Sequence, residues 1–251
     1  MRLIPVLVGP AGSGKSTLAA AYLAWLREGG ADACVANFDP AAVTLPYEPG
    51  FDVRRYVDAR EIAKKYGLGP NGALVKAVEI AAEKLPDMLG ELDGCASEYI
   101  IVDTPGQMEV FLFRDIAWKL SEALQKLGTV YAFFVLDAEM LKRPEDYGFL
   151  LVMATSVAMR LGVETAPVIN KADLAPATPF TGDTLRDFGK LSKMLKKSHS
   201  LYAELLRDLL KTLLAYSRNV DVPRVSALRR EGLEELHRLL LEMGCSCGDL
   251  S

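Results

Sequence analysis

Residues 9–17 read Gly9-Pro10-Ala11-Gly12-Ser13-Gly14-Lys15-Ser16-Thr17, between an apolar run at 3–8 and a stretch with helical spacing. They fit the pattern Gly-x-x-x-x-Gly-Lys-Ser/Thr in the strand-then-helix context that this pattern requires. Glycines let successive backbone N–H groups turn inward, and the start of the following helix adds positive potential, so the loop suits a polyphosphate. The stretch therefore predicts a phosphate-binding loop (P-loop) within an α/β fold.

The polar groups of the P-loop have separate expected roles. Lys15 should reach the β and γ phosphates of a nucleotide, and the Ser16 hydroxyl should bind a Mg²⁺ ion that bridges them. The competing interpretation is a glycine turn that only joins strand and helix, but the complete motif and both flanks favour the P-loop. The residues expected to contact the nucleotide here are Gly12, Ser13, Gly14, Lys15, Ser16 and Thr17.

Strand-length apolar runs alternate with longer stretches of helical spacing along the chain. The runs lie at 3–8, 33–38, 99–102, 130–136, 166–169 and 222–225, and the helical stretches at 15–28, 72–85, 109–127, 147–161 and 231–243. This order predicts a doubly wound, mainly parallel sheet flanked by helices. We expect one P-loop domain over residues 1–251, with helical insertions at about 40–98 and about 174–219, and ligands at the carboxyl ends of the strands.

Composition limits the partners of this chain. Its 251 residues include 33 acidic and 29 basic ones, with a net charge of −4, and this balance disfavours a nucleic-acid partner. The longest apolar runs are shorter than the roughly 20 residues that span a bilayer, and we expect a cytoplasmic protein without membrane contact. The four cysteines, at 34, 95, 245 and 247, lack zinc-site spacing and are expected to be reduced thiols.

A second motif, Asp103-Thr104-Pro105-Gly106-Gln107, directly follows the apolar run at 99–102. Asp103 should hold Mg²⁺ directly or through a water, and Gly106 lets the backbone approach a γ-phosphate. Gln107 is placed to orient the attacking water. Glu109, two residues further on, either helps to align that water or is a first-turn helix acid, and both interpretations stay open. Asp-x-x-Gly alone is often a plain turn; the buried strand before it and the P-loop favour the functional interpretation.

The run at 166–169 ends in Asn170-Lys171-Ala172-Asp173, the Asn-Lys-x-Asp pattern of guanine sites. Asp173 can accept hydrogen bonds from N1–H and the exocyclic amine of guanine, which adenine does not offer. The stem of Lys171 can pack over the base, while Asn170 either ties this loop to the P-loop or reaches the base edge. The alternative is an Asn that caps a helix. Further on, the backbone N–H of Ala227 lies where guanine sites often bind O6.

The insertion between the second and third runs carries Gly69-Pro70-Asn71, and with the motifs above the chain resembles the GPN-loop GTPase family. That family belongs to the dimerising P-loop NTPases, which include MinD and the nitrogenase iron protein. The likeness covers essentially the whole length, including 37–41. It implies a homodimer in which Asn71 reaches the partner's phosphate site, and a role for Asp39 near Mg²⁺ or the attacking water. Taken alone, Gly-Pro-Asn is simply a turn.

The resemblance implies a Mg²⁺-dependent homodimer that binds and hydrolyses GTP to GDP and acts as a molecular switch. A protein client is expected, with assembly of a complex such as RNA polymerase as the role that the family suggests. Two other functions stay open: a phosphotransferase that uses the same P-loop, and an assembly scaffold with a structural nucleotide. A leucine stripe at helical spacing is expected to be core rather than a docking groove; its members are Leu201, Leu205, Leu209, Leu213 and Leu214.

Overall fold

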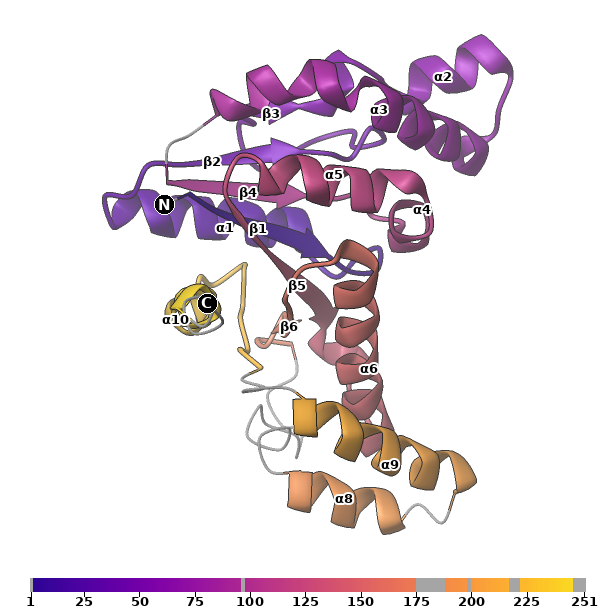
Figure 1. Ribbon diagram of the computed structural model, residues 1–251, viewed down its shortest axis with the longest axis vertical. Coiled ribbons are helices and arrows are strands. Elements are labelled where there is room, and N and C mark those ends of the chain that lie inside the picture. Colours follow the sequence, from indigo (N-terminus) through magenta and orange to yellow (C-terminus); the bar gives the residue numbers. More distant parts are fainter. Residues whose placement is uncertain (1, 96–97, 175–187, 198–199, 217–221, 246–251) are drawn as a thin grey trace.

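In the described part of the chain, the computed structural model has one sheet of six parallel strands, in the order β3-β2-β4-β1-β5-β6 (Figure 1). The structure describes residues 2–95, 98–174, 188–197, 200–216 and 222–245. The strands are β1 Leu3–Val8, β2 Ala33–Asn37, β3 Phe51–Asp52, β4 Tyr99–Asp103, β5 Thr129–Asp137 and β6 Thr165–Asn170. Every strand pair is parallel, which confirms the predicted fold class.

Helices connect these strands and flank the sheet (Figure 1). They are α1 Lys15–Glu28, α2 Ala59–Tyr66, α3 Pro70–Asp93, α4 Met108–Leu112, α5 Asp115–Gln125, α6 Pro144–Leu161, α8 Phe188–Lys197, α9 Leu201–Tyr216 and α10 Leu233–Cys245. Short 3-10 turns follow β3 at Val53–Arg55 and β5 at Ala138–Met140. The two predicted insertions therefore contain α2 and α3, and α8 and α9.

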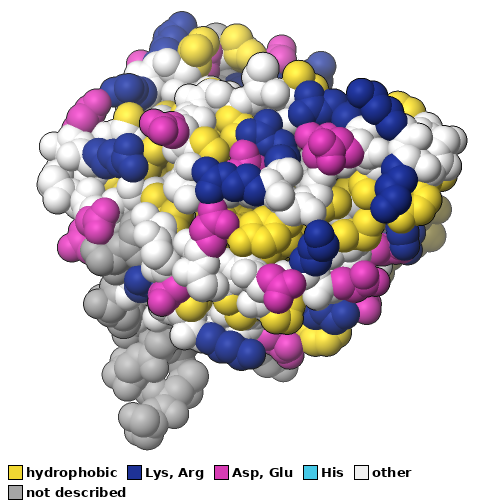
Figure 2. Space-filling model, turned by 90° about the horizontal axis from the view of Figure 1, so that it is seen from above, with side chains coloured by type: hydrophobic (Ala, Val, Ile, Leu, Met, Phe, Trp, Pro, Cys, Tyr) yellow, Lys and Arg dark blue, Asp and Glu magenta, His cyan; other side chains and the backbone are white. Residues whose placement is uncertain are grey.

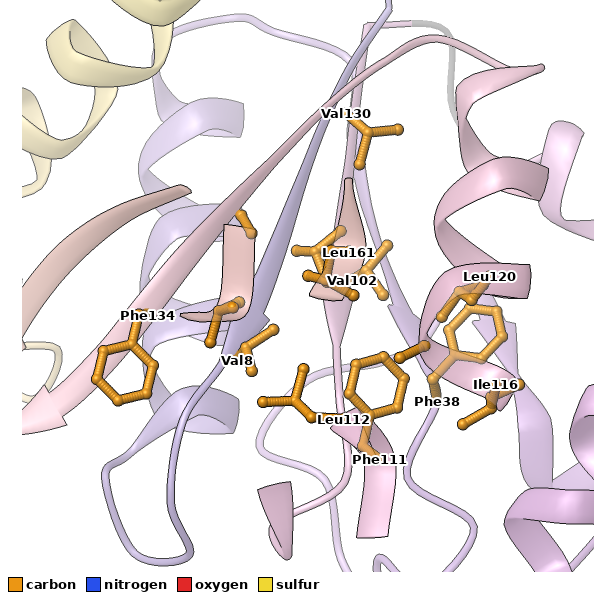
Figure 3. Packing of buried hydrophobic residues seen from close by; sticks show 14 of the residues in the cluster. Val8, Phe38, Val102, Phe111, Leu112, Ile116, Leu120, Val130, Phe134 and Leu161 are labelled. Carbon is orange, nitrogen blue, oxygen red and sulfur yellow. The ribbon is translucent and has the colours of Figure 1, made fainter. Parts of the chain in front are cut away.

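Side chains of each strand alternate between two hydrophobic cores. Ile4, Val6 and Val8 of β1 face the core that α3, α5 and α6 cover, whereas Leu3 and Leu7 face the core beneath α1 and α10. Figure 3 shows part of the first core, where Phe38 at the end of β2 lies beside Ile116 and Leu120 of α5. Because a strand exposes alternate residues to opposite faces, this division is that of a doubly wound sheet.

The described residues contain six strands, as many as predicted, but one of the predicted six is misplaced. Residues 222–225 form only an isolated bridge to β6, between Ile169 and Arg224. Pro223 has no N–H to donate, which limits a ladder there. The strand that the prediction missed is β3. Its two residues are too few to produce a periodic pattern in the sequence.

Helix α3 begins and ends beyond its predicted bounds of 72–85. Gly69 is its N-cap and Pro70 its first residue, where a missing N–H costs no hydrogen bond. The helix then continues through Pro86 to Asp93. Burial of Met88 and Leu92 offsets the hydrogen bond that Pro86 removes.

Two other helical predictions need correction. The helix predicted for 109–127 is divided into α4 and α5. On α9, Leu201, Leu205 and Leu209 are 76, 65 and 41% exposed, so the prediction that this stripe is core was wrong for them. Helix α9 packs on α6 through another face, which buries Ala203 and Leu210. The side chain of Leu214 lies outside the described residues.

Surface charge is mixed on the face seen in Figure 2, where Lys and Arg side chains are interspersed with Asp and Glu and with hydrophobic areas. Neither sign forms a continuous patch on that face. Among the helices within the described ranges, none has both the length and the apolar character needed to cross a bilayer.

A disulfide joins Cys34 of β2 to Cys95, just after α3, with the two Cα atoms 6.0 Å apart. The prediction that these two cysteines are reduced thiols was therefore wrong. Gly50 lies against the bond, since a Cβ there would come within 2.6 Å of the Cys95 sulfur. The side chain of Cys245 and all of Cys247 lie outside the described residues. The disulfide ties the end of the long insertion to the second strand.

We expect Cys95→Ser to lower the free energy of unfolding by about 2–4 kcal/mol, because the disulfide closes a long loop in the unfolded chain. Thermal unfolding with and without dithiothreitol measures this effect. The reductant should lower the Tm of the wild-type protein to that of the variant and leave the variant unchanged. Equal wild-type Tm values in both conditions would contradict the prediction.

Candidate nucleotide site

The P-loop connects β1 to α1 at the carboxyl edge of the sheet. Gly14 has φ of 86°, and a Cβ there would lie 2.5 Å from the Asn170 side-chain nitrogen, so both conformation and space require glycine. The Lys15 ammonium donates hydrogen bonds to the carbonyls of Gly9, at 2.8 Å, and Pro10, at 3.2 Å. Burial lowers the pKa of Lys15, and the nearby carboxylates of Asp103 and Asp39 oppose that shift. Lys15 thus lies folded into its own loop, beside two carboxylates.

Asp103 ends β4 and is 1% exposed. The Tyr47 hydroxyl donates to its Oδ2 at 2.7 Å, whereas its Oδ1 has no hydrogen-bond partner of ordinary geometry among the described residues. Burial raises the pKa of Asp103, although the hydroxyls of Ser16 and Tyr47 and the charge of Lys15 oppose the shift. Ser16 is therefore close to the carboxylate without making that missing hydrogen bond.

These groups fit a magnesium ion. A buried carboxylate oxygen without a partner beside a serine hydroxyl supplies the hard oxygen ligands that Mg²⁺ prefers. Within the described ranges, no three carboxylate, imidazole or thiol side chains gather into a complete metal site. Mg²⁺ commonly completes its shell with waters and phosphate oxygens. Ser16 and Asp103 would hold the ion, with Asp39 as the nearby third oxygen group.

Asp39 follows β2 and faces the loop after Asp103. Its Oδ2 accepts from the Gly106 N–H at 3.3 Å, and its Oδ1 accepts from the Ala41 N–H at 2.9 Å. Burial raises the pKa of Asp39, and these two N–H groups and Lys15 lower it in part. The carboxylate predicted near Mg²⁺ or water is therefore bonded to the loop that should sense the γ-phosphate.

A polar network that the sequence did not reveal supports Asp39. Buried Asn37 donates to Asp52 Oδ1 at 2.9 Å and accepts from the Asp39 N–H at 3.0 Å. Arg54 in turn pairs with Asp52 at 2.6 Å. Burial alone would raise the pKa of Asp52, but hydrogen bonds from Arg54 and Asn37 outweigh it and lower the pKa. The register pairs Asn37 with both Asp52 and Asp103, so the three align across neighbouring strand ends.

Gln107 and Asn71 meet within one chain. The Gln107 side-chain amide donates to Asn71 Oδ1 at 3.1 Å, and both side chains lie near the surface. Asn71 is in the first turn of α3, and Gln107 is the N-cap of α4. Glu109 is exposed in the first turn of α4, which leaves both interpretations of this residue open.

Asn170 joins the predicted base-reading loops to the P-loop. Its amide donates to the carbonyls of Ser13, at 2.9 Å, and Gly14, at 3.3 Å, and its Oδ1 accepts from the Ala227 N–H at 3.2 Å. These bonds occupy the side chain that would otherwise cap a helix. The phosphate loop and the two loops predicted to bind the base therefore share one buried side chain.

The predicted guanine reader Asp173 accepts a hydrogen bond from the Ser226 hydroxyl at 2.6 Å. That bond lowers the pKa of Asp173, so the side chain is an ionised acceptor at neutral pH. Lys171 has φ of 59° and pairs with Asp137 at 2.6 Å. Asp137 ends β5 at the same edge of the sheet. A polar residue directly after an apolar strand is a signal that could have identified it from the sequence.

A groove of about 550 Å³ runs from this region along α1. Its lining includes Thr17 of the P-loop motif, Tyr47, Ala227 and Leu228. The groove therefore adjoins the end of the P-loop motif and the residue predicted to contact O6.

We expect Asp103→Asn to raise the Tm of the nucleotide-free protein by about 2–4 °C at about pH 8, with little gain at about pH 4. Because burial raises the pKa of Asp103, the folded protein loses stability as pH rises from the ordinary aspartate pKa through the raised value. Asn removes that loss and still accepts from Tyr47. Thermal unfolding across this pH range is the measurement, and an equal gain at both ends would contradict the cause.

Known proteins resemble this chain in sequence and in fold. A family model described as "Conserved hypothetical ATP binding protein" matches residues 7–246. A GPN-loop GTPase of Pyrococcus abyssi is 37% identical over 99% of this chain and the full length of the relative. The crystal structure of that GTPase in its apo form has a TM-score of 0.85, with 35% identity and 98% of each chain covered. GPN-loop GTPase 1 of Dictyostelium discoideum is 28% identical over 92% of this chain. The matched part covers 58% of that relative, which is the longer protein.

Proposed function

The chain belongs to the GPN-loop GTPase family, and on that premise we propose that it is a Mg²⁺-dependent GTPase that works as a homodimeric switch. The observation that carries this proposal is the set of bonds from Asn170 to the P-loop and to Ala227. These bonds fix the phosphate site and the base site relative to one another. A nucleotide can therefore be recognised at both ends at once.

Guanine is the base that the site supports. The family model's description names ATP, whereas the relatives are named GTPases; the chemistry of Asp173 favours the latter. Its carboxylate, held by Ser226, accepts from N1–H and the exocyclic amine of guanine. Adenine has neither donor at those positions, so it would leave the carboxylate without a partner. The Ala227 N–H is the donor proposed for O6.

Hydrolysis uses groups that converge on the phosphate end. Lys15 would exchange its bonds to loop carbonyls for the β and γ phosphates. Bound Mg²⁺, held by Ser16 and Asp103, would screen the charge that develops on the phosphates. Gln107 orients the water, and Asp39 fixes the loop at Gly106 through its hydrogen bond. Loss of the γ-phosphate would free that loop, which gives the switch two states.

The partner of each chain is proposed to be a second copy of it. Family resemblance assigns Asn71 to the neighbouring phosphate site, while its bond to Gln107 in the same chain offers the alternative role in cis. Lys15 is the one lysine of the P-loop. The early positions of the loop, where a second lysine could stand, are Pro10 and Ala11. Another group must therefore complete the site at the γ-phosphate. Asn71 is our candidate, since its amide can donate hydrogen bonds to phosphate or water.

We further propose that the GTP and GDP states are read by a protein client. Resemblance to the family suggests assistance in assembling a protein complex such as RNA polymerase. Turnover distinguishes this switch from a scaffold with a structural nucleotide, since a scaffold needs no water-orienting Gln107. Phosphate release from GTP without an acceptor distinguishes it from a phosphotransferase.

We expect Asp173→Asn to weaken GTP binding by at least about 100-fold and to shift preference towards xanthosine triphosphate. Xanthine carries a C2 carbonyl, which the native carboxylate repels and the Asn amide can bind. Competition binding with GTP, ATP and xanthosine triphosphate measures the shift. Asp208→Asn, at a 69% exposed side chain on α9, is the matched control. ATP binding as tight as GTP binding to the wild-type protein would rule out the assignment of Asp173.

Mixed dimers test where Asn71 acts. We expect Asn71→Ala and Gln107→Ala each to slow single-turnover hydrolysis by about 10- to 100-fold. If Asn71 acts in trans, co-expressed chains of the two variants form mixed dimers in which one site has both residues. Random mixing should then restore about a quarter of the wild-type sites.

Phosphate release measures the recovery, and successive affinity purification through a different tag on each variant confirms that mixed dimers form. In the cis arrangement neither site of a mixed dimer has both Asn71 and Gln107. Mixed dimers without any recovery would therefore rule out the trans role. A single-turnover rate that neither substitution changes would remove both residues from the catalytic site.

A further inference from the structure

Tyr47 is a site residue that no sequence motif indicated. Its hydroxyl donates to Oδ2 of Asp103 across 56 positions of sequence. The carboxylate is buried, and its Oδ1 is the oxygen without a partner among the described residues. We infer that Tyr47 is a positioning residue for the metal site: by holding Oδ2, it keeps Oδ1 turned to the place beside Ser16 where a Mg²⁺ ion would bind. This inference rests on the Mg²⁺-dependent function proposed above.

Several contacts hold Tyr47 itself in place. Its ring packs against the hydrophobic core beneath α1. Tyr47 lies in the loop 42–50. At the start of this loop, Arg54 donates to the Ala42 carbonyl at 2.9 Å. At the end, the Gly50 N–H donates to the Val35 carbonyl at 2.9 Å. The loop that carries Tyr47 is therefore held at both ends and its ring is packed, so the hydroxyl can set the orientation of a neighbouring group.

The hydrogen bond affects metal binding in two opposing ways. Donation to Oδ2 withdraws some negative charge from the carboxylate, which weakens its attraction for a cation. It also prevents rotation of the carboxylate. Without this bond both buried oxygens would lack a partner, and the carboxylate could rotate to orientations that suit the ion less well. Orientation is the larger effect, since partners of metal-binding carboxylates typically change metal affinity by about 10- to 100-fold when they are removed.

A structural role and a positioning role predict different results for Tyr47→Phe. The ring remains in this variant, so packing against the core and the wall of the groove are retained. Only the donor to Asp103 is lost. If Tyr47 served packing alone, Phe would replace it without consequence at the metal site.

The test is binding of N-methylanthraniloyl-GDP, a fluorescent GDP, first in EDTA and then at increasing Mg²⁺ concentration. We expect Tyr47→Phe to match the wild-type affinity in EDTA within about twofold, whereas the Mg²⁺ concentration for half-maximal tightening rises by about tenfold. Tyr66→Phe, at a 49% exposed tyrosine at the end of α2, is the matched control and should resemble the wild-type protein in both measurements.

The outcomes separate this inference from the proposed function. A wild-type protein that responds to Mg²⁺, with an unchanged Mg²⁺ midpoint in Tyr47→Phe, would overturn the role of Tyr47 and leave the function standing. An equal loss of GDP affinity with and without Mg²⁺ would also overturn it, because Tyr47 would then act on the nucleotide rather than on Asp103. A wild-type protein indifferent to Mg²⁺ would refute the metal-dependent function, and the inference with it.

Discussion

The side-chain amide of Asn170 is the contact on which the nucleotide site depends. It bonds to carbonyls of the P-loop on one side and to the Ala227 N–H on the other. Because it is buried, loss of either partner would leave a polar group without compensation in the interior. Gly14 is glycine partly because this amide occupies the space of a side chain. One residue thereby sets the distance between the loops for phosphate and base.

The phosphate end places charges where folding alone disfavours them. Burial raises the pKa of Asp39 and Asp103 and lowers that of Lys15, so each charged form is less stable here than in water. Attraction between Lys15 and the two carboxylates opposes these shifts without removing them, whereas repulsion from Asp39 adds to the shift of Asp103. Such a site is preorganised in part: the two carboxylates are already held in place, whereas Lys15 must leave the carbonyls of its own loop when phosphate binds. The stability lost at this edge is offset by the two hydrophobic cores behind it.

Local motifs predict this edge of the sheet well, because parallel strands bring their carboxyl ends together. The P-loop, Asp103 and Asn170 could each be placed from a few neighbouring residues. Three contacts could not be predicted in this way, because each joins positions that are not neighbours in the sequence. They are the bond of Tyr47 to Asp103, the bond between Asn37 and Asp52, and the disulfide of Cys34 and Cys95. The leucine stripe of α9 failed for another reason: periodicity identifies an apolar face, but not whether another element covers it.

The insertion between β2 and β4 contacts the loop of Asp103 to Gln107 at successive points. Asp39, at its start, bonds to Gly106; Tyr47 bonds to Asp103; Asn71, at the start of α3, bonds to Gln107. Each hydrogen bond contributes only about 1 kcal/mol, but together they approach the few kcal/mol that separate two states of a switch. Movement of the loop would therefore break several bonds to the insertion at once. The other end of α3 is fixed to β2 by the disulfide, so such a movement would be taken up near Asn71, the end of the helix proposed to meet the partner.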